Sequence, residues 1–276
     1  MGKRSPFWFR FWGTRGSLPA PRESTNRYGG NTPCVEVRAG DRIIILDAGS
    51  GIRELGLLLS REFDPVQATI LLSHYHWDHI HGFPFFGPAY HEKNQFDIYG
   101  EPRGKRNVKD ILAGQMARPY FPIPIDVMKA RMDFKAISSG DSVRMGEVVI
   151  SAHSLNHPGK CLCYRIEHQN KALIYATDTE HGAALDGSLV AFARGAEALI
   201  YDSAYTDEEM RNGRKGWGHS TWKEGIKVAL AAQVEKLYLF HHEPVRNDRS
   251  LRVIELAARR QFKNAMAARE RIVYDV

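Results

Sequence analysis

Apolar and polar positions between residues 7 and 73 follow the spacing of strands, with one helical stretch among them. The segment FWFRFWG at 7–13 is typical of an edge strand that runs into the loop GTRGSLPAP. In CVEVRAGDRIIILDAGSG, residues 34–51, two β-rich runs flank the turn AGD, which predicts a hairpin. The apolar spacing in 51–63 predicts a helix, and PVQATILLS at 65–73 predicts a buried strand.

Between Glu101 and Phe134 clear periodicity is lost. The proline-rich stretch RPYFPIPID lies here, and such a segment is typical of an insertion that wraps the body or covers a cleft. Strand patterning returns in 141–157 and in a second predicted hairpin at 161–181. Two further strands are predicted: one in 195–205, which ends near an acid, and a final apolar strand at 237–244. Helical spacing is found in 221–236 and in a basic amphipathic helix at 248–270.

This order of elements consists of two β-rich halves, each with helices. It predicts an α+β (α/β) fold of two stacked mixed sheets with helices outside, in one domain over 1–276, with a lid or insertion at about 101–134. The chain is 43% hydrophobic and 25% charged, as globular proteins are. No apolar stretch approaches the ~20 residues of a membrane span. The start MGKRSPFWFRFWG lacks the apolar core and cleavage site of a signal peptide.

Net charge and cysteine content indicate which binding partners and which cellular compartment to expect. A net charge of +6 and a sequence pI near 9.2 favour acidic partners such as phosphate esters or nucleic acid. Three cysteines, an odd number, argue against a disulfide framework and fit a reducing, cytoplasmic compartment. Cys161 and Cys163 could be soft metal ligands, but their spacing of two more simply places both on one face of a strand.

The stretch LLSHYHWDHIHGF at 71–83 crowds histidines at the end of a predicted strand. His74, His76, Asp78 and His79 form H-x-H-x-D-H. The period of two points the first three to one side, and only a turn after the strand brings His79 inward. That geometry suits two neighbouring metal sites, because a catalytic zinc ion takes about three protein ligands and a water. Three further candidates each follow an apolar strand: His157, Asp178 and His241.

With these residues the sequence resembles the metallo-β-lactamase superfamily over almost its whole length. The resemblance implies an αββα sandwich with a dinuclear metal site between the sheets. By motif position, it implies one ion held by His74, His76 and His157, a second held by Asp78, His79 and His241, and Asp178 as the bridge. A hydroxide bridging the two ions would then be the nucleophile, since paired cations activate a shared water and clamp both oxygens of a displacement.

Asp47, in IIILDAGSG, matches a family aspartate that orients the metal ligands from behind. A simple turn-forming aspartate explains it equally well. Zinc suits a histidine-rich site with two carboxylates, yet Mn²⁺ or Fe²⁺ accepts the same donors.

The segment GHSTWKEGIKVAL at 218–230 resembles the H-S-T segment of the tRNase Z and phosphodiesterase branch. The resemblance implies His219 as a general acid held by a carboxylate, which joins Asp78 as a catalytic residue. Asp202 stands where that branch has glutamate, one methylene longer. GHST also reads as a helix N-cap, with Ser220 or Thr221 as the cap, and the two interpretations are compatible. His81, His153, His181 and His242 are better explained as supporting or surface residues.

The segment FWGTRGSLPAPRESTNRYGGNTPCVEV resembles bacterial members related to cyclic-phosphate and cyclic-nucleotide phosphodiesterases. Four residues of it are candidates for the substrate mouth, although ordinary loop turns explain the glycines equally well: Arg15, Ser17, Asn31 and Thr32. A basic, glycine-rich arm like that of the tRNase Z branch is absent from the sequence, and EPRGKRNVKD has only a short reach. Small phosphodiesters are therefore favoured over structured RNA.

The leading hypothesis is a dinuclear metal-dependent phosphodiesterase acting on small or cyclic phosphodiesters. Three alternatives stay open: thioester or lactam hydrolysis with the same metals but without His219, tRNA 3′ processing, and a metal-binding sensor without catalysis. The sequence does not decide the oligomeric state, a homodimer included.

Overall fold

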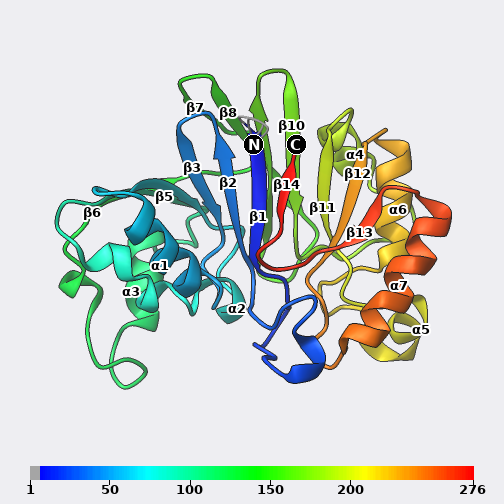
Figure 1. Ribbon diagram of the computed structural model, residues 1–276, viewed down its shortest axis with the longest axis horizontal. Helices are drawn as coiled ribbons and strands as arrows, with labels where there is room; N and C mark the ends of the chain where they lie inside the picture. The colour runs from blue at the N-terminus through cyan, green and yellow to red at the C-terminus, as the bar shows by residue number, and fades with distance from the viewer. Residues whose placement is uncertain (1–6) are drawn as a thin grey trace.

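The computed structural model describes residues 7–276, which form two seven-stranded sheets packed face to face (Figure 1). The first sheet has the order β14-β1-β2-β3-β4-β5-β6, and the second has the order β13-β12-β11-β10-β9-β8-β7. Helices α1 and α3 lie on the outer side of the first sheet, and α4, α6 and α7 lie on the outer side of the second (Figure 1). The αββα sandwich is therefore confirmed.

The elements have the following bounds in these two sheets and their helices. The strands of the first sheet are β1 (Phe7–Gly13), β2 (Cys34–Ala39), β3 (Arg42–Leu46), β4 (Gln67–Leu71), β5 (Gln95–Gly100), β6 (Arg131–Ala136) and β14 (Val273–Asp275). Those of the second are β7 (Ser142–Met145), β8 (Val148–Leu155), β9 (Cys161–His168), β10 (Lys171–Ala176), β11 (Ala198–Asp202), β12 (Lys236–Phe240) and β13 (Ala265–Ala267). The helices are α1 (Ile52–Glu62), α2 (Trp77–Ile80), α3 (Val108–Gln115), α4 (Gly187–Ala193), α5 (Asp207–Glu209), α6 (Trp222–Ala231) and α7 (Asp248–Gln261).

Three apolar layers hold the sandwich together. Between the sheets, the rings of Phe9 and Tyr238 meet edge to face with centroids 4.9 Å apart. Leu55 of α1 and Leu112 of α3 are buried against the first sheet, and Ile226 of α6 against the second. Burying each such side chain contributes about 1.5–3 kcal/mol, so these apolar faces dock the helices onto the sheets. The faces of α1 and α6 were predicted from spacing, whereas that of α3 was not.

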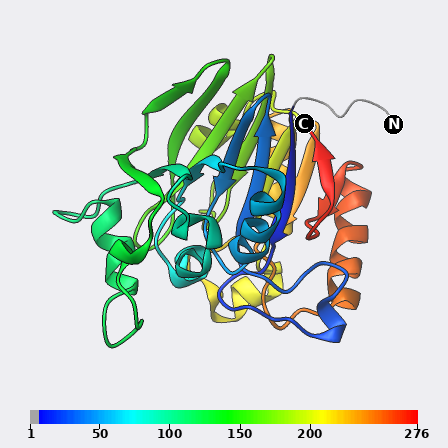
Figure 2. The ribbon, with the colours of Figure 1, turned by 60° about the vertical axis from the view of Figure 1, so that its left-hand side comes forward.

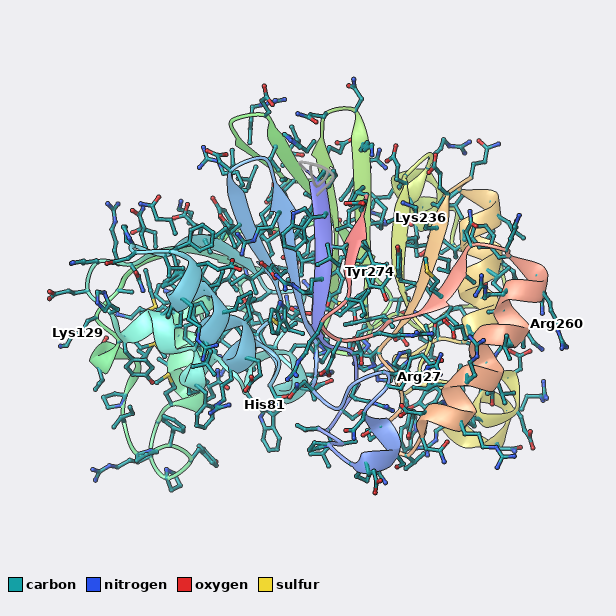
Figure 3. All side chains as sticks on the ribbon, in the orientation of Figure 1. Arg27, His81, Lys129, Lys236, Arg260 and Tyr274 are labelled. Atoms are coloured by element: carbon teal, nitrogen blue, oxygen red, sulfur yellow. The ribbon has the colours of Figure 1, made fainter. Side chains whose placement is uncertain are left out.

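The polar candidate residues collect at one end of the sandwich. Strands β10, β11 and β12 are parallel, as are β3 and β4, so their carboxyl ends point to the same side. His81, labelled in Figure 3, lies at this end, just after α2. Ligand sites are expected where parallel strands end, and the fold brings distant residues together there.

The segment 7–13 is not an edge strand, and this prediction was wrong. β1 pairs with β2 on one side and with β14 on the other, where Trp8 faces Asp275 and Arg10 faces Val273. A three-residue strand at the end of the chain leaves too short a pattern to be recognised in the sequence. It covers the backbone groups of β1 that an edge would expose.

The basic helix predicted for 248–270 ends at Gln261, nine residues early. Beyond it, Ala265 and Ala267 are buried in β13, which runs parallel to β12, so 237–244 is not the final strand either. The alanines that favoured a helix serve instead as small side chains in a buried strand, which shows that tertiary packing overrides local propensity.

Residues 101–134 are more regular than the sequence suggested. They contain α3, which begins with reciprocal hydrogen bonds between Asn107 and Asp110, and most of β6, which pairs in parallel with β5 at the edge of the first sheet. The remaining loops stand out from the body (Figure 2).

Among residues 7–276, no helix has the length and apolar character needed to cross a membrane. The prediction that no signal peptide is present rests partly on residues 1–6, which lie outside the described residues.

Candidate metal centre

The donor side chains of the histidine motif are placed by a strand end followed by a one-turn helix. β4 ends at Leu71, and the extended residues after it carry His74 and His76. His76 is the N-cap of α2, with φ −62° and ψ 151°, so the chain then turns into the helix that carries Asp78 and His79. The turn expected from the sequence to bring His79 inward is this short helix.

One group of donors is compact and fully buried, and we call it the closed cluster: Asp78, His79, Asp178 and His241. Nε2 of His79 lies 3.3 Å from Oδ2 of Asp78 and 3.2 Å from Oδ1 of Asp178. Nε2 of His241 lies 3.2 Å from each of the same oxygens and 3.3 Å from Nε2 of His79. Donors bonded at ~2.0–2.1 Å to a tetrahedral ion lie roughly 3.3 Å apart, so this spacing fits one divalent cation.

A second group, the open cluster, consists of His74, His76, His157 and Asp178. Nδ1 of His76 lies 3.1 Å from Nε2 of His157. Oδ2 of Asp178 lies 3.5 Å from Nε2 of His74 and 3.9 Å from Nε2 of His157. His76 is exposed, whereas the other three are buried. The two oxygens of Asp178 face different clusters, which is the geometry expected of a bridging ligand.

The open cluster also contains an unsatisfied donor atom. Nε2 of His74 is buried and has no hydrogen-bond partner among the residues that the structure describes. Burying a polar nitrogen without a partner is costly, and a metal ion beside the other three donors would satisfy it. Imidazole and carboxylate donors suit zinc, and Mn²⁺ or Fe²⁺ accepts them too. The seven residues therefore fit two divalent ions, with Asp178 shared.

Asp47 stands behind the closed cluster. Its Oδ2 accepts hydrogen bonds from Nδ1 of His79 and the hydroxyl of Tyr175, each at 2.7 Å, and its Oδ1 accepts from the backbone N–H of Ser73 at 2.7 Å. A proton held on Nδ1 leaves the Nε2 lone pair free for a metal and fixes the ring plane. Asp47 also has a φ of 61°, so the turn-forming interpretation holds alongside the orienting one.

Backbone groups orient the other donors. Nδ1 of His157 donates to the carbonyl of Gly218 at 2.7 Å, and the N–H of Ser17 donates to Oδ2 of Asp78 at 2.8 Å. Gly218 has a φ of 86°, and a Cβ there would lie 2.3 Å from Nδ1 of His157, so this close approach requires glycine.

Strained backbone gathers at the same place. Asp178 and His241 have φ values of 47° and 60°, in the left-handed region that most residues avoid. Such conformations cost roughly 1–3 kcal/mol each and persist where the surroundings hold them, typically at functional sites.

The electrostatics favour neutral imidazoles in the open cluster. Burial lowers the pKa of His74, His76 and His157, and a neutral ring is the form that binds a metal. Burial also opposes a charge on His79, but the surrounding carboxylates, Asp178 foremost, raise its pKa well above the ordinary value. A metal ion would displace that proton. Despite its own burial, Asp178 has a pKa held well below normal by the imidazoles around it, which keeps the bridge ionised.

His219 and Asp202 form a hydrogen-bonded pair beside the closed cluster. Nδ1 of His219 lies 2.8 Å from Oδ2 of Asp202, and the His219 ring stacks on His241 with centroids 4.8 Å apart. The backbone N–H groups of Thr179 and Ala204 donate to Asp202 and fix it. Burial lowers the pKa of His219, but Asp202 outweighs this and raises it to about 9, so the carboxylate favours the protonated ring. The shorter aspartate therefore reaches the histidine.

The loop that carries His219 is held by Glu180, which the sequence analysis did not single out. Its Oε1 and Oε2 accept hydrogen bonds from the N–H groups of Gly216 and Gly218, each at 2.8 Å. The backbone of Glu180 is in turn tied to Asn156 by two hydrogen bonds. After the loop, Thr221 caps α6, so the helix-cap interpretation also holds.

The four predicted mouth residues have different positions. Ser17 is exposed beside the closed cluster, where its backbone N–H donates to Asp78, and its place at a substrate mouth stays a prediction. Arg15 is fully buried and its guanidinium donates to the carbonyls of Gly29, Glu243 and Arg246, so it supports the loop instead of lining the mouth. Asn31 and Thr32 also serve the loop, through hydrogen bonds to Glu270 and Ser50 respectively. The polar side chains of a turn were mistaken for groups directed outward.

The remaining histidines and cysteines lie outside the donor groups. Nε2 of His242 donates to the carbonyl of Ala268, which leaves His241 as the donor residue of that pair. His153 stacks on Phe192, and Nδ1 of His181 contacts Ser220 Oγ. Cys161 and Cys163 pack together in the apolar layer under α4 and α6, on one face of β9.

A cavity of about 780 Å³ opens beside the open cluster. His74 and His76 lie in its wall, together with residues from α2, from the 3₁₀ turn after it, and from the segment 103–121. It therefore opens directly onto these two donors of the open cluster.

Comparisons with known proteins agree with this architecture. Residues 42–242, more than half of the chain, match the model of the family described as "Beta-lactamase superfamily domain". The chain belongs to the metallo-β-lactamase superfamily. It is a metal-dependent hydrolase of that superfamily, and its two donor clusters could each hold a metal ion.

Among relatives in this superfamily, the Ribonuclease Z of Picrophilus torridus is 25% identical, over 99% of this chain and 96% of its own. The solved structure of the metallo-β-lactamase fold protein YhfI from Bacillus subtilis superposes with a TM-score of 0.75 at 19% identity and covers 99% of this chain and 100% of that one. A diphosphatase from the PhnP family superposes with a TM-score of 0.70 at 15% identity and covers 98% of both chains. These structural matches show a shared fold, and the relatives place the chain near the tRNase Z branch.

Proposed function

We propose that the protein is a phosphodiesterase that binds two divalent metal ions, most simply Zn²⁺, and hydrolyses small or cyclic phosphodiesters. The observation that carries the proposal is the His219–Asp202 pair, 2.8 Å apart and in contact with the closed cluster. Hydrolysis of an alkyl phosphodiester needs a proton donor for a poor leaving oxygen, whereas a thioester releases a thiolate that leaves without one. The names of the relatives, Ribonuclease Z and a PhnP-family diphosphatase, support phosphoester chemistry.

In this proposal each group of residues has a separate task. His74, His76, His157 and Asp178 hold one ion, and Asp78, His79, His241 and Asp178 hold the other. Bound ions of this kind supply an activated water and neutralise phosphate charge. His219 keeps its proton through Asp202 and gives it to the departing oxygen, while Ser17 stands at the entrance.

The experiment compares two phosphodiesters with unequal leaving groups. Bis(p-nitrophenyl) phosphate releases a stable phenolate that needs little help from an acid, whereas a 2′,3′-cyclic nucleotide releases an alkoxide. We expect chelator-sensitive turnover of both. We expect His219→Ala to lower kcat/KM for the cyclic nucleotide by roughly 10²–10⁴-fold and for the aryl ester by much less. His153→Ala, a histidine on the outer face, is the matched control and should change neither rate.

Two results would contradict the proposal. One is the absence of chelator-sensitive turnover on any phosphodiester of a broad panel. The other is hydrolysis of thioesters or lactams that is unchanged in His219→Ala, which would assign the site to that chemistry instead.

A further inference from the structure

The cavity beside the open cluster has walls of unusual composition. Five aromatic side chains line it, in addition to its histidines: Tyr75, Trp77, Phe85, Tyr120 and Phe121. Trp77 and Tyr120 are each 80% exposed and Phe85 is 55% exposed. Large rings left this open to water beside a metal centre are unusual for packing alone and are typical of a ligand surface.

The walls come from two parts of the chain that are fastened to each other. The rings of Phe85 and Phe121 meet edge to face with centroids 5.7 Å apart. Nε2 of Gln115, on α3, donates to the carbonyl of Ile80 at 3.1 Å. The insertion is thus anchored to the segment that carries the histidine motif, and the cavity is built before any ligand arrives.

Two polar side chains in the cavity wall are suited to hydrogen-bond the edge of a heterocyclic ring and to pair with a phosphate. The carbonyl oxygen of the Gln115 side chain has no partner among residues 7–276, so it can accept from an N–H of a ligand. Arg106 is exposed, and its guanidinium has no ion-pair partner within the described part of the chain. Arg103 is different, because Glu101 and the carbonyl of Lys160 hold it over the ring of Tyr75.

These features select among the apolar groups that a phosphodiester could carry. An alkyl chain would be served by aliphatic walls and has no use for a hydrogen-bond acceptor. A planar heterocycle stacks on aromatic faces, donates N–H groups from its edge, and brings a phosphate for the arginine. The volume of about 780 Å³ lies within the roughly 300–1,000 Å³ typical of small-ligand sites.

We infer that this cavity binds the nucleobase of the substrate, which makes a nucleoside phosphodiester of one or two nucleotides the substrate class. The inference rests on the proposed function, because it takes the phosphate to lie on the metal donors His74 and His76 in the cavity wall. The base stacks against Tyr120 and Trp77, and the Gln115 carbonyl reads its edge.

The test uses two substrates that share a leaving group. Thymidine 5′-(p-nitrophenyl phosphate) and methyl p-nitrophenyl phosphate both release p-nitrophenolate and differ only in the part that is retained. With the metal-loaded protein, we expect kcat/KM to be at least about tenfold higher for the thymidine ester, mainly through a lower KM. Tyr120→Ala should reduce that preference about five- to tenfold and leave the methyl ester within twofold. Tyr120→Phe, which keeps the ring, should retain the preference.

Phe63→Ala removes another exposed ring, at the end of α1, and is the matched control that should change neither substrate. Equal kcat/KM for the two esters in the wild type would overturn the inference and leave the proposed function standing. So would a Tyr120→Ala variant that slows both esters equally, or tighter competition by lysophosphatidic acid than by thymidine monophosphate.

If neither ester is hydrolysed, the proposed function fails, and the cavity is tested by binding alone. Calorimetric titration of the metal-loaded protein should then show thymidine monophosphate binding at least about tenfold more tightly than methyl phosphate, with the difference lost in Tyr120→Ala. Equal affinities would overturn the inference.

Discussion

The two donor clusters share Asp178 and the same kinds of ligand, yet they differ in nearly every other respect. In the closed cluster all four donors are buried and the donor–donor distances are 3.2–3.3 Å. Asp47 accepts a hydrogen bond from His79, and the Ser17 N–H donates one to Asp78, so both ligands are braced. In the open cluster the distances run from 3.1 to 3.9 Å, and His76 is exposed at the wall of the cavity.

This difference suggests a division of labour within one centre. A buried, braced cluster is preorganised, so it can hold an ion at little cost in reorganisation. An exposed donor beside a cavity leaves room for a ligand to approach. We therefore expect the closed cluster to bind its ion more tightly and the open cluster to face the substrate. The predictions that follow test this contrast.

Removal of the shared ligand should have the largest effect. Asp178→Ala takes one oxygen from each cluster and leaves buried imidazoles without their carboxylate. We expect metal content to fall at both positions and turnover to drop well beyond the roughly 10–100-fold typical of losing an outer hydrogen-bond partner. Elemental analysis and a phosphodiester assay measure the two effects. Retention of two ions per chain would show that Asp178 is not a bridge.

Asp47→Ala should damage the closed cluster more than the open one. Without the carboxylate, Nδ1 of His79 loses its 2.7 Å partner, and we expect metal affinity at this cluster to fall roughly 10–100-fold. The open cluster is linked to Asp47 only indirectly, through the Ser73 hydroxyl that contacts Nδ1 of His74, and should lose less affinity. Tyr175→Phe removes a different hydrogen bond to Asp47 and is the control for packing effects. Equal loss from both clusters, or a matching loss in Tyr175→Phe, would argue that Asp47 acts on folding.

Much of this contrast could be anticipated from residues, and some could not. The H-x-H-x-D-H motif and the strand-end positions of His157, Asp178 and His241 identified donors, because strand ends are visible in a hydrophobic pattern. The sequence predicted only that the ligands divide between two ions. It did not predict that one cluster is buried and the other open. Burial and bracing depend on contacts between segments more than 60 residues apart, such as His157 with Gly218.

The sequence-based predictions were wrong where an element is very short or a polar side chain is buried. β14 is too short to leave a pattern, and Arg15 has the composition of a substrate ligand but the surroundings of a loop brace. The helix α3 left a signal that was overlooked, because Asn107 and Asp110 have the spacing of a reciprocal cap. Glu180 could not be recognised from the sequence, because a glutamate close to a metal-ligand candidate has no distinctive pattern.

Glu180→Gln should produce the smallest effect, on the loop that carries His219 and the Gly218 carbonyl to which His157 donates. The amide keeps one acceptor oxygen but cannot accept from both Gly216 and Gly218, so the loop loses one hydrogen bond worth about 1 kcal/mol. We expect kcat for a substrate with an alkoxide leaving group to fall roughly fivefold, with KM for the aryl ester and metal content unchanged. Loss of metal, or equal slowing of both substrates, would place Glu180 in the general support of the fold.

The most direct test of the central claim is graded chelation of the purified protein, with metal content and phosphodiester turnover followed together. Two unequal clusters sharing one bridge predict two divalent ions per chain, released in two separate steps. Turnover should disappear with the first ion, from the open cluster. A single ion per chain, or turnover that survives removal of both, would contradict the account.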